Sequence, residues 1–275
     1  MVIAEMFVLF ILYSFLGWVW ETIYCSIQNG EFRNRGFLFG PICPIYGCCV
    51  VFVQLLCRYG KGIVSAEAPV WRTFLICAVG SAVAEYATSW YLEKRFHARW
   101  WDYSKIPLNL NGRIALPISL CFGAAGVLIV RYLLPSLSHA GGFVHPLVWE
   151  ALSLILMGVF AADFALTEAA LNSLLQRIET MENEFNTRAQ SAYEAVAEKP
   201  QQISAKVKGI EEEFRSRVSS AASGLTAGQK HIMENIRSFR PVKKRRYTLH
   251  AGQKLKEALA EAKLRRKKTA DGKQS

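Results

Sequence analysis

The stretch GEFRNRGFLFGPICPIYG, from Gly30 to Gly47, decides the fold of this chain. It follows an apolar N-terminal segment, MVIAEMFVLFILYSFLGWVW, and it leads into a second apolar run. Charge, glycine and proline are concentrated where the chain would enter a membrane. Backbone that is not helical is tolerated at membrane depth only when protein buries it or when it lines a water-filled cavity. This stretch is therefore the first candidate for a functional element.

The segment from Gly36 to Gly40 has two interpretations. The apolar run from Ile42 to Cys57 is short for a bilayer, and Pro41 suits a first helical turn, where the missing N–H is not needed. Either residues 36–40 enter the membrane as non-helical chain, or they form an interfacial loop with aromatic anchors, because span length tolerates such variation.

Composition divides the 275-residue chain into two halves. Residues 1–165 contain 11 Lys and Arg against 9 Asp and Glu, whereas the remainder contains 22 against 13. The whole chain therefore has a formal charge of +11, most of it in the second half. An apolar, nearly neutral half followed by a basic one indicates a membrane domain with a soluble tail.

Five apolar stretches are long enough to cross the hydrocarbon, which takes about 20 residues in a helix. They are residues 2–27, 37–57, 70–92, 114–134 and 147–166. The first has no basic residue before it and no small-residue cleavage site after it, which favours a retained span over a removed signal peptide. The expected fold is all-α, with a transmembrane domain over residues 1–166.

The connections between spans predict the orientation. Loops 28–36 and 93–113 contain Arg and Lys, whereas residues 135–146 contain neither. Basic loops stay on the cytoplasmic side. The N-terminus is therefore expected outside and the basic tail in the cytoplasm.

The tail, residues 167–275, has apolar residues at helical spacing from Leu171 to Phe185 and again from Ile203 to Phe214. Ile232, Ile236 and Phe239 predict a last short helix. We expect helices with a coiled-coil tendency, too few apolar residues for a sizeable core, and partial disorder towards the C-terminus.

Ionisable side chains inside spans are costly, which makes each a candidate for function. Glu21 lies in the first span, and Glu85, Ser89 and Glu93 recur on one stripe of the third. Asp163 lies near the inner end of the fifth. The alternative is structural, namely interhelical ion pairs with arginine, and it is favoured for Glu93 and Asp163, with Arg33, Arg35 and Arg113 as partners.

The loop WWDYSKIPLNLNGR, residues 100–113, is the second informative stretch. Its tryptophans and Tyr103 fit an interfacial aromatic belt, and Asn111-Gly112 is a turn signal before the fourth span. Its many hydrogen-bonding side chains equally fit a loop folded back over the spans, facing Asn34 and Arg35.

Several chemistries are absent from the sequence. The seven cysteines lack metal-ligand spacing, so no metal and no cofactor is expected. There is no G-x-x-x-x-G-K-[ST], H-E-x-x-H or G-x-S-x-G motif, so the chain is expected to have no ATPase of its own and not to be an enzyme. The basic clusters near Arg237–Arg246 and Lys263–Lys268 suit anionic membrane lipid better than nucleic acid.

Four motifs together resemble the bacterial membrane family called Putative ABC-transporter type IV. They are YSFLGWVWETIY (13–24), NRGFLFGPICPIYG (34–47), TSWYLE (88–93) and WDYSKIPLNLNGR (101–113). The resemblance covers roughly residues 5–165 and implies a multi-spanning, permease-like protein of a bacterial inner membrane.

The leading hypothesis is a permease-like subunit of an ABC-type transporter that relies on a separate cytoplasmic ATPase. Five spans are few for a transport pathway, which favours a homo-oligomer or a partner subunit. The alternatives are a membrane scaffold that recruits partners or lipid through its tail, and an intramembrane enzyme with paired acids. The expected binding residues are Glu21, Asn34, Arg35, Glu85, Ser89, Glu93, Asp102, Tyr103, Asn109, Asn111 and Arg113.

Overall fold

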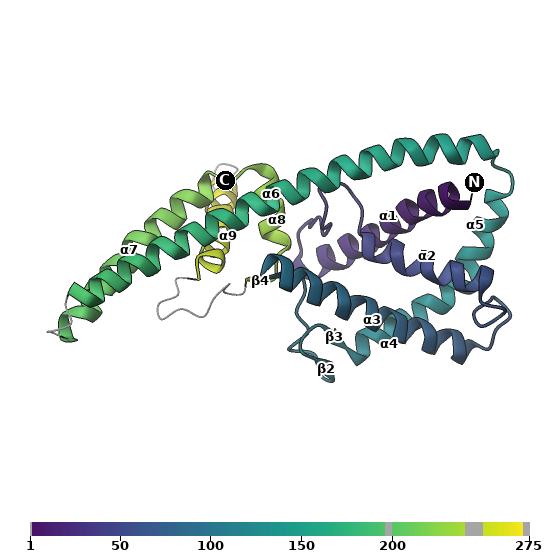
Figure 1. Cartoon of the computed structure of the whole chain (residues 1–275), viewed down its shortest axis with the longest axis horizontal. Helices are drawn as coiled ribbons and strands as arrows, with labels where there is room; N and C mark the ends of the chain where they lie inside the picture. Colours follow the sequence, from purple (N-terminus) through teal and green to yellow (C-terminus); the bar gives the residue numbers. More distant parts are fainter. Residues whose placement is uncertain (1, 196–199, 240–249, 272–275) are drawn as a thin grey trace. The chain divides into compact units, whose positions relative to one another are not determined.

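The computed structural model describes residues 2–195, 200–239 and 250–271 and is helical over most of them, which confirms the all-α class (Figure 1). It divides into two compact units, which we call the first unit (residues 1–92 and 101–167) and the second unit (93–100 and 168–275). The helices are α1 (Val2–Asn29), α2 (Pro44–Tyr59), α3 (Val70–Phe96), α4 (Leu116–Leu128), a π-helix (Ile129–Leu133), α5 (Leu134–Gly141), α6 (Pro146–Ala195), α7 (Pro200–Ser223), α8 (Ala227–Asn235) and α9 (Ala251–Asp271). The strands are β1 (Ala98–Arg99), β2 (Asn109–Leu110), β3 (Ile114–Ala115) and β4 (Ser238–Phe239).

Three helical stretches of the described chain are long and apolar enough to cross a membrane. They are Val2–Asn29, Leu116–Gly141 and Pro146–Ala192. Helix α2 is apolar but has only 16 residues, and the 27 residues of α3 are interrupted by charged groups that include Arg72 and Glu85. The structure therefore supports three of the five expected spans by length and composition.

The second expected span begins later than the sequence suggested. Residues 32–43 are not helical, and the helix starts at Pro44, with Cys43 as its N-cap, instead of at Phe37 or Pro41. Leu38, in the middle of this non-helical segment, is fully buried. Residues 36–40 are therefore non-helical, as both interpretations expected, and this chain packs into the protein.

Helices α1 and α2 of the first unit pack closely at two glycines. A Cβ atom built on Gly17 would lie 2.5 Å from the Cβ of Tyr46. A Cβ on Gly47 would lie 2.5 Å from the backbone oxygen of Phe10 and would also collide with Ser14. Small residues allow helix backbones to approach this closely in membrane proteins. The close packing positions Tyr46 against α1.

Helices α3 and α4 cross closely at a glycine in the same way (Figure 1), since a Cβ atom built on Gly126 of α4 would collide with Cys77 of α3. The fourth expected span ends at residue 134, but the helix continues to Gly141, seven residues further. It does so through the π-helical turn Ile129–Leu133, which lies just before Pro135. Proline lacks the N–H that a regular turn would use there, which accounts for the widened turn.

The second unit contains a core that the sequence analysis did not expect. Phe185 of α6 and Phe214 of α7 meet edge to face, with ring centroids 5.5 Å apart. The prediction that the tail is too polar for a core of its own was wrong, because the apolar stripes of four helices face one another. The buried apolar residues include Leu171, Leu174, Ile178, Val218, Ile232, Met233, Leu255 and Leu259.

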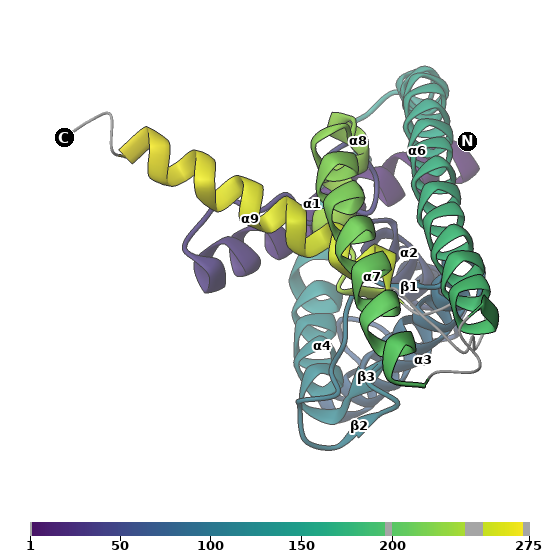
Figure 2. The ribbon, with the colours of Figure 1, turned by 90° about the vertical axis from the view of Figure 1, so that its left-hand side faces the viewer.

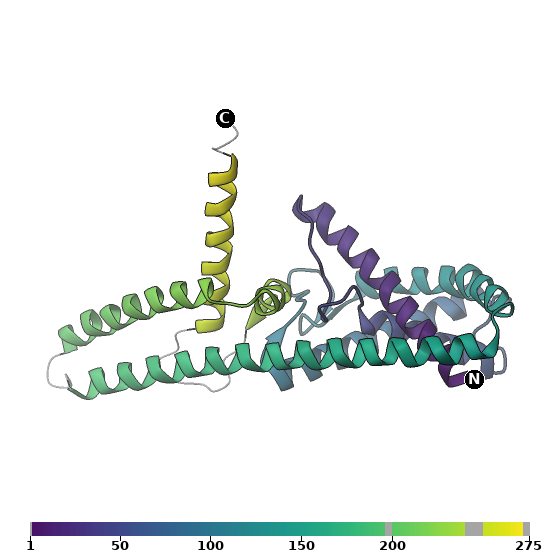
Figure 3. The same ribbon diagram turned by 90° about the horizontal axis from the view of Figure 1, so that it is seen from above.

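Two further expectations for the tail need correction. Phe239 does not extend a helix, because Ser238–Phe239 pairs as β4 with β1, and the backbone N–H of Arg237 donates to the oxygen of Arg99 at 2.6 Å. Partial disorder is expected towards the C-terminus, but residues 251–271 of this region form helix α9. This helix begins beside α7 and extends away from it (yellow in Figures 2 and 3). Residues 272–275, also covered by that expectation, lie outside the described residues.

We predict that acid weakens the contact between α7 and α9. The Nζ of Lys254 lies 2.5 Å from Oε1 of Glu211, and this hydrogen bond holds the pKa of Glu211 below its ordinary value of 4.5. A lowered folded-state pKa contributes stability above the ordinary value that is lost as pH falls through the folded value. Unfolding of the tail, followed by circular dichroism, should therefore become easier below pH 4.5. Because the pair is half-exposed, the effect should be small, and Glu211→Gln should remove it. If Glu211→Gln loses as much stability below pH 4.5 as the wild type does, groups other than Glu211 cause the loss.

Candidate functional site

Two partly buried carboxylate–tyrosine pairs lie inside the first unit. Tyr46 of α2 donates its hydroxyl to Oε1 of Glu21 on α1 at 2.5 Å. Tyr103, from the loop after α3, donates to Oε1 of Glu85 on α3 at 3.1 Å. The first pair joins α1 to α2, and the second joins the loop after α3 to α3 itself, so the acids help to hold neighbouring elements together.

The two pairs belong to one cluster, which we call the acidic cluster: Glu21, Arg35, Tyr46, Glu85 and Tyr103. Glu21 and Glu85 are close enough to interact electrostatically. Arg35 acts on Tyr103, and the field of Glu21 also reaches Tyr103. Three helices and two loops of the first unit therefore contribute charged or polar groups to a single interior site.

Tyr103 is a hydrogen-bond donor in this cluster at any physiological pH. Burial raises the pKa of its phenol, and the neighbouring carboxylate of Glu85 raises it further. A phenol that keeps its proton can stabilise a carboxylate by donation without adding charge. The sequence placed Tyr103 among the expected binding residues, and the structure places it against Glu85.

The non-helical segment after α1 is held by a carboxylate of α6. Oδ1 of Asp163 accepts the backbone N–H of Phe39 at 3.0 Å, and Oδ2 accepts that of Gly40 at 2.9 Å. Thr167, one turn further on, accepts from Phe39 at 3.3 Å. The expected ion pair of Asp163 with an arginine was wrong, because backbone N–H groups satisfy this carboxylate instead.

Asn34 anchors the start of the same segment. Its Oδ1 accepts the indole N–H of Trp18 at 2.7 Å and the backbone N–H of Gly36 at 3.2 Å. At the other end, the backbone N–H of Cys43 donates to the oxygen of Ser14 at 2.9 Å. The predicted binding residue Asn34 therefore has a structural part, which is to shape the chain next to Arg35.

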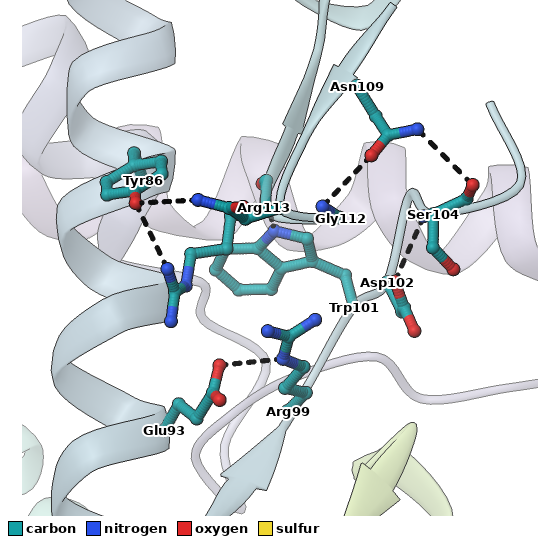
Figure 4. A network of polar contacts seen from close by, with 10 residues as sticks. Tyr86, Glu93, Arg99, Trp101, Asp102, Ser104, Asn109, Gly112 and Arg113 are labelled. Atoms are coloured by element: carbon teal, nitrogen blue, oxygen red, sulfur yellow. Dashed lines mark hydrogen bonds and ion pairs between the residues drawn. The ribbon is translucent and has the colours of Figure 1, made fainter. Parts of the chain in front are cut away.

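The loop from Trp101 to Arg113 is organised around Tyr86 of α3 (Figure 4). The hydroxyl of Tyr86 accepts from Arg113 at 3.1 Å and from Asn111 at 3.2 Å. The indole N–H of Trp101 donates to the backbone oxygen of Arg113 at 2.9 Å. These contacts fold the loop back against α3 and thereby deliver Tyr103 to Glu85.

The predicted turn at Asn111-Gly112 is confirmed. Both residues have positive φ, at 56° and 68°, between the paired strands β2 and β3. Asp102 accepts the backbone N–H of Ser104, and Asn109 accepts that of Gly112 (Figure 4). These two contacts stabilise the loop itself.

Two predicted residues lie on α3 beyond Glu85. Ser89 is buried one turn further on. Glu93 belongs to the second unit and pairs with Arg99 at 2.7 Å, both side chains being largely buried. The expected pairing of Glu93 with an arginine is correct, but the partner is six residues away and is none of the three suggested.

Sequence reasoning missed Tyr46 and Tyr86 as partners of the candidate residues. Tyr46 stands in the quoted stretch 30–47, where it was read only as part of a motif. Tyr86 follows Glu85 directly, but nothing in the sequence shows that its hydroxyl meets the 111–113 turn.

Metal chemistry has no candidate site in the described chain, where no three His, Cys, Asp or Glu side chains are grouped to hold an ion. The site can instead accept hydrogen bonds and positive charge through its carboxylates.

The comparisons with known proteins agree with the resemblance seen in the four motifs. The model of the family described as Putative ABC-transporter type IV matches residues 8–168, which includes every residue of the acidic cluster. No curated protein and no solved structure matches the chain significantly. Since the match covers more than half of the chain, this protein belongs to the Putative ABC-transporter type IV family.

Proposed function

We propose that this membrane protein is the permease-like subunit of an ABC-type transporter and relies on an ATPase carried by another chain. The acidic cluster carries the proposal. Charged groups inside membrane helices are costly and mark substrate or ion pathways, and here Glu21 of α1 and Glu85 of α3 lie close enough to interact electrostatically. Family membership supports a role in transport.

The topology that we propose has five spans, with the N-terminus outside and the second unit in the cytoplasm of a bacterial cell. The basic loops 28–36 and 93–113 support it through the positive-inside rule. The short α2 would cross with the buried segment before it, because non-helical backbone is tolerated where protein covers it. The charged α3 would cross with Glu85 turned to the protein interior.

The loop from Trp101 to Arg113, together with the β2–β3 hairpin, offers a docking surface for the ATPase; we call it the hairpin loop. Leu108 is 73% exposed and Leu110 is 54% exposed, on the side of the first unit that we place in the cytoplasm. Exposed apolar side chains on a structured loop are typical of protein contacts. The ATPase would contact the chain here, beside the Tyr103 that reaches the acidic cluster.

The test is capture of the tagged full chain from native membranes in mild detergent, followed by mass spectrometry. A stoichiometric cytoplasmic ATPase should be recovered, and Leu108→Asp should reduce its recovery strongly. Leu264→Asp is the matched control, since Leu264 is comparably exposed at 60% but lies on α9. Recovery without any ATPase would reject the permease proposal.

A scaffold is the second candidate, favoured by the folded second unit and its basic helix α9. It predicts that cell-envelope or lipid-synthesis proteins are captured instead and that Leu264→Asp, not Leu108→Asp, releases them. The two variants thus separate the two functions.

A further inference from the structure

One oxygen of Glu85 is buried without a partner. The side chain is 7% exposed, and while Oε1 accepts from Tyr103, Oε2 has no hydrogen-bond partner among the described residues. No described lysine or arginine forms an ion pair with it. A buried charge is normally paired and hydrogen-bonded, because leaving it bare costs several kcal/mol. This oxygen therefore marks an incomplete site.

The charges around that oxygen leave an excess of negative charge. Glu21 interacts with Glu85, and its own oxygens accept from Tyr46 and from the thiol of Cys25. The guanidinium that acts on this cluster is that of Arg35, which interacts with Tyr103 and Cys25. The acidic cluster thus contains two carboxylates and one guanidinium, and this excess of negative charge attracts one further positive charge.

We propose that the acidic cluster binds the ammonium group of a small organic cation against Oε2 of Glu85. This inference rests on the proposed function, because it makes organic cations the substrate class of the transporter. An ammonium group supplies the positive charge that balances the carboxylate. Its N–H groups or polarised methyl groups can also contact the unpartnered carboxylate oxygen.

The neighbouring aromatic rings favour an organic cation over a metal ion. Tyr46 meets Phe122 of α4 edge to face, with centroids 6.0 Å apart, directly beside the carboxylate of Glu21. Aromatic faces attract quaternary and primary ammonium groups. A metal ion would need several anionic or imidazole ligands, and the described chain groups no three of them.

The loop that carries Tyr103 controls access to the site. Tyr103 covers one side of Glu85, and its loop is fastened to α3 through Asn111, Arg113 and Tyr86. Because Oε2 is closed off in this structure, a ligand can reach it only when the loop or a helix moves. The same hairpin carries Leu108, so movement of the proposed docking surface would open the site.

The experiment measures binding of choline and ethanolamine to the purified full chain in lipid nanodiscs. Ligands that bind only the folded protein raise its melting temperature in a concentration-dependent way. We expect both amines to do so, and 3,3-dimethylbutan-1-ol, the uncharged isostere of choline, to have no effect. Glu85→Gln should weaken choline binding about 30-fold or more, because it removes the charged partner of a buried pair. Glu67→Gln, on an exposed loop, should bind as the wild type does.

Equal stabilisation by the neutral isostere, or undiminished choline binding by Glu85→Gln, would overturn the proposal. So would the absence of any shift, which would indicate a Glu85 carboxyl that simply keeps its proton. If Glu85→Gln does not fold, the wild type can be tested by itself. Choline should protect Glu85 from modification by dicyclohexylcarbodiimide, which peptide mass spectrometry measures. Lack of protection would count against the site. Binding is measured without an ATPase, so this inference and the proposed function can fail separately.

Discussion

Asp163→Asn is expected to release the non-helical segment before α2. The carboxylate accepts two backbone N–H groups, those of Phe39 and Gly40, from a distance of more than 120 residues along the chain. Hydrogen bonds to charged groups contribute about 1.5–3 kcal/mol each. Asparagine keeps the size but replaces one acceptor oxygen with an NH2 group, which would face an N–H donor. The lost bond, the weakening of the remaining one by the loss of charge, and the contact between NH2 and an N–H donor together cost about 3 kcal/mol.

The buried thiol of Cys43 reports this release. Its side chain is 7% exposed, at the end of the segment that Asp163 holds. A cost of about 3 kcal/mol increases the open population about 100-fold, at 1.4 kcal/mol for each tenfold. Maleimide modification of Cys43, followed by peptide mass spectrometry, should accelerate accordingly in Asp163→Asn.

Thr167→Val provides a graded comparison for this prediction. It removes the longer contact from Phe39, at 3.3 Å, and the hydroxyl's own donation to Oδ1 of Asp163, at 3.4 Å, but leaves the carboxylate in place. Modification of Cys43 should therefore be faster than in the wild type but slower than in Asp163→Asn. If both variants react at the wild-type rate, Asp163 does not hold the segment.

Local features of the site could be predicted from the sequence, whereas its long-range contacts could not. The Asn111-Gly112 turn and the start of α3 at Val70 follow from dipeptide and periodicity signals. The start of α2 was misplaced because Pro41 and Pro44 both suit a first helical turn. What decides between them is the anchoring of Phe39 and Gly40 by Asp163, and no local pattern contains that information.

The same limit explains the second unit. The apolar stripe from Leu171 to Phe185 predicts an amphipathic helix, but not which surface covers it. The structure covers it with α7, α8 and α9, and it adds β1 from the loop after α3. A two-residue strand paired across about 140 residues has no signature of its own, and the sequence alone therefore predicts too few apolar residues for a sizeable core in the tail.

Gly47→Val is expected to separate α1 from α2 and to destabilise the first unit severely. The added Cβ would lie 2.5 Å from the backbone oxygen of Phe10 and would collide with Ser14. A backbone oxygen cannot rotate away as a side chain can, so the helices themselves would have to move apart. Overpacking of a tight contact costs about 1–3 kcal/mol and more when backbone must shift. Movement of α2 would also withdraw Tyr46 from Glu21, leaving a buried carboxylate without its donor.

Gly80→Val separates this packing effect from the effect of valine in a helix. Gly80 lies in α3, where an added Cβ would meet nothing within 4 Å. Both substitutions replace glycine with the same β-branched residue inside a helix, so their intrinsic helix terms are the same. The melting temperature of purified protein in detergent should therefore fall steeply for Gly47→Val and little for Gly80→Val. Equal melting temperatures would mean that α1 and α2 do not pack through Gly47, and the acidic cluster would then lose the helix contact that brings Tyr46 to Glu21.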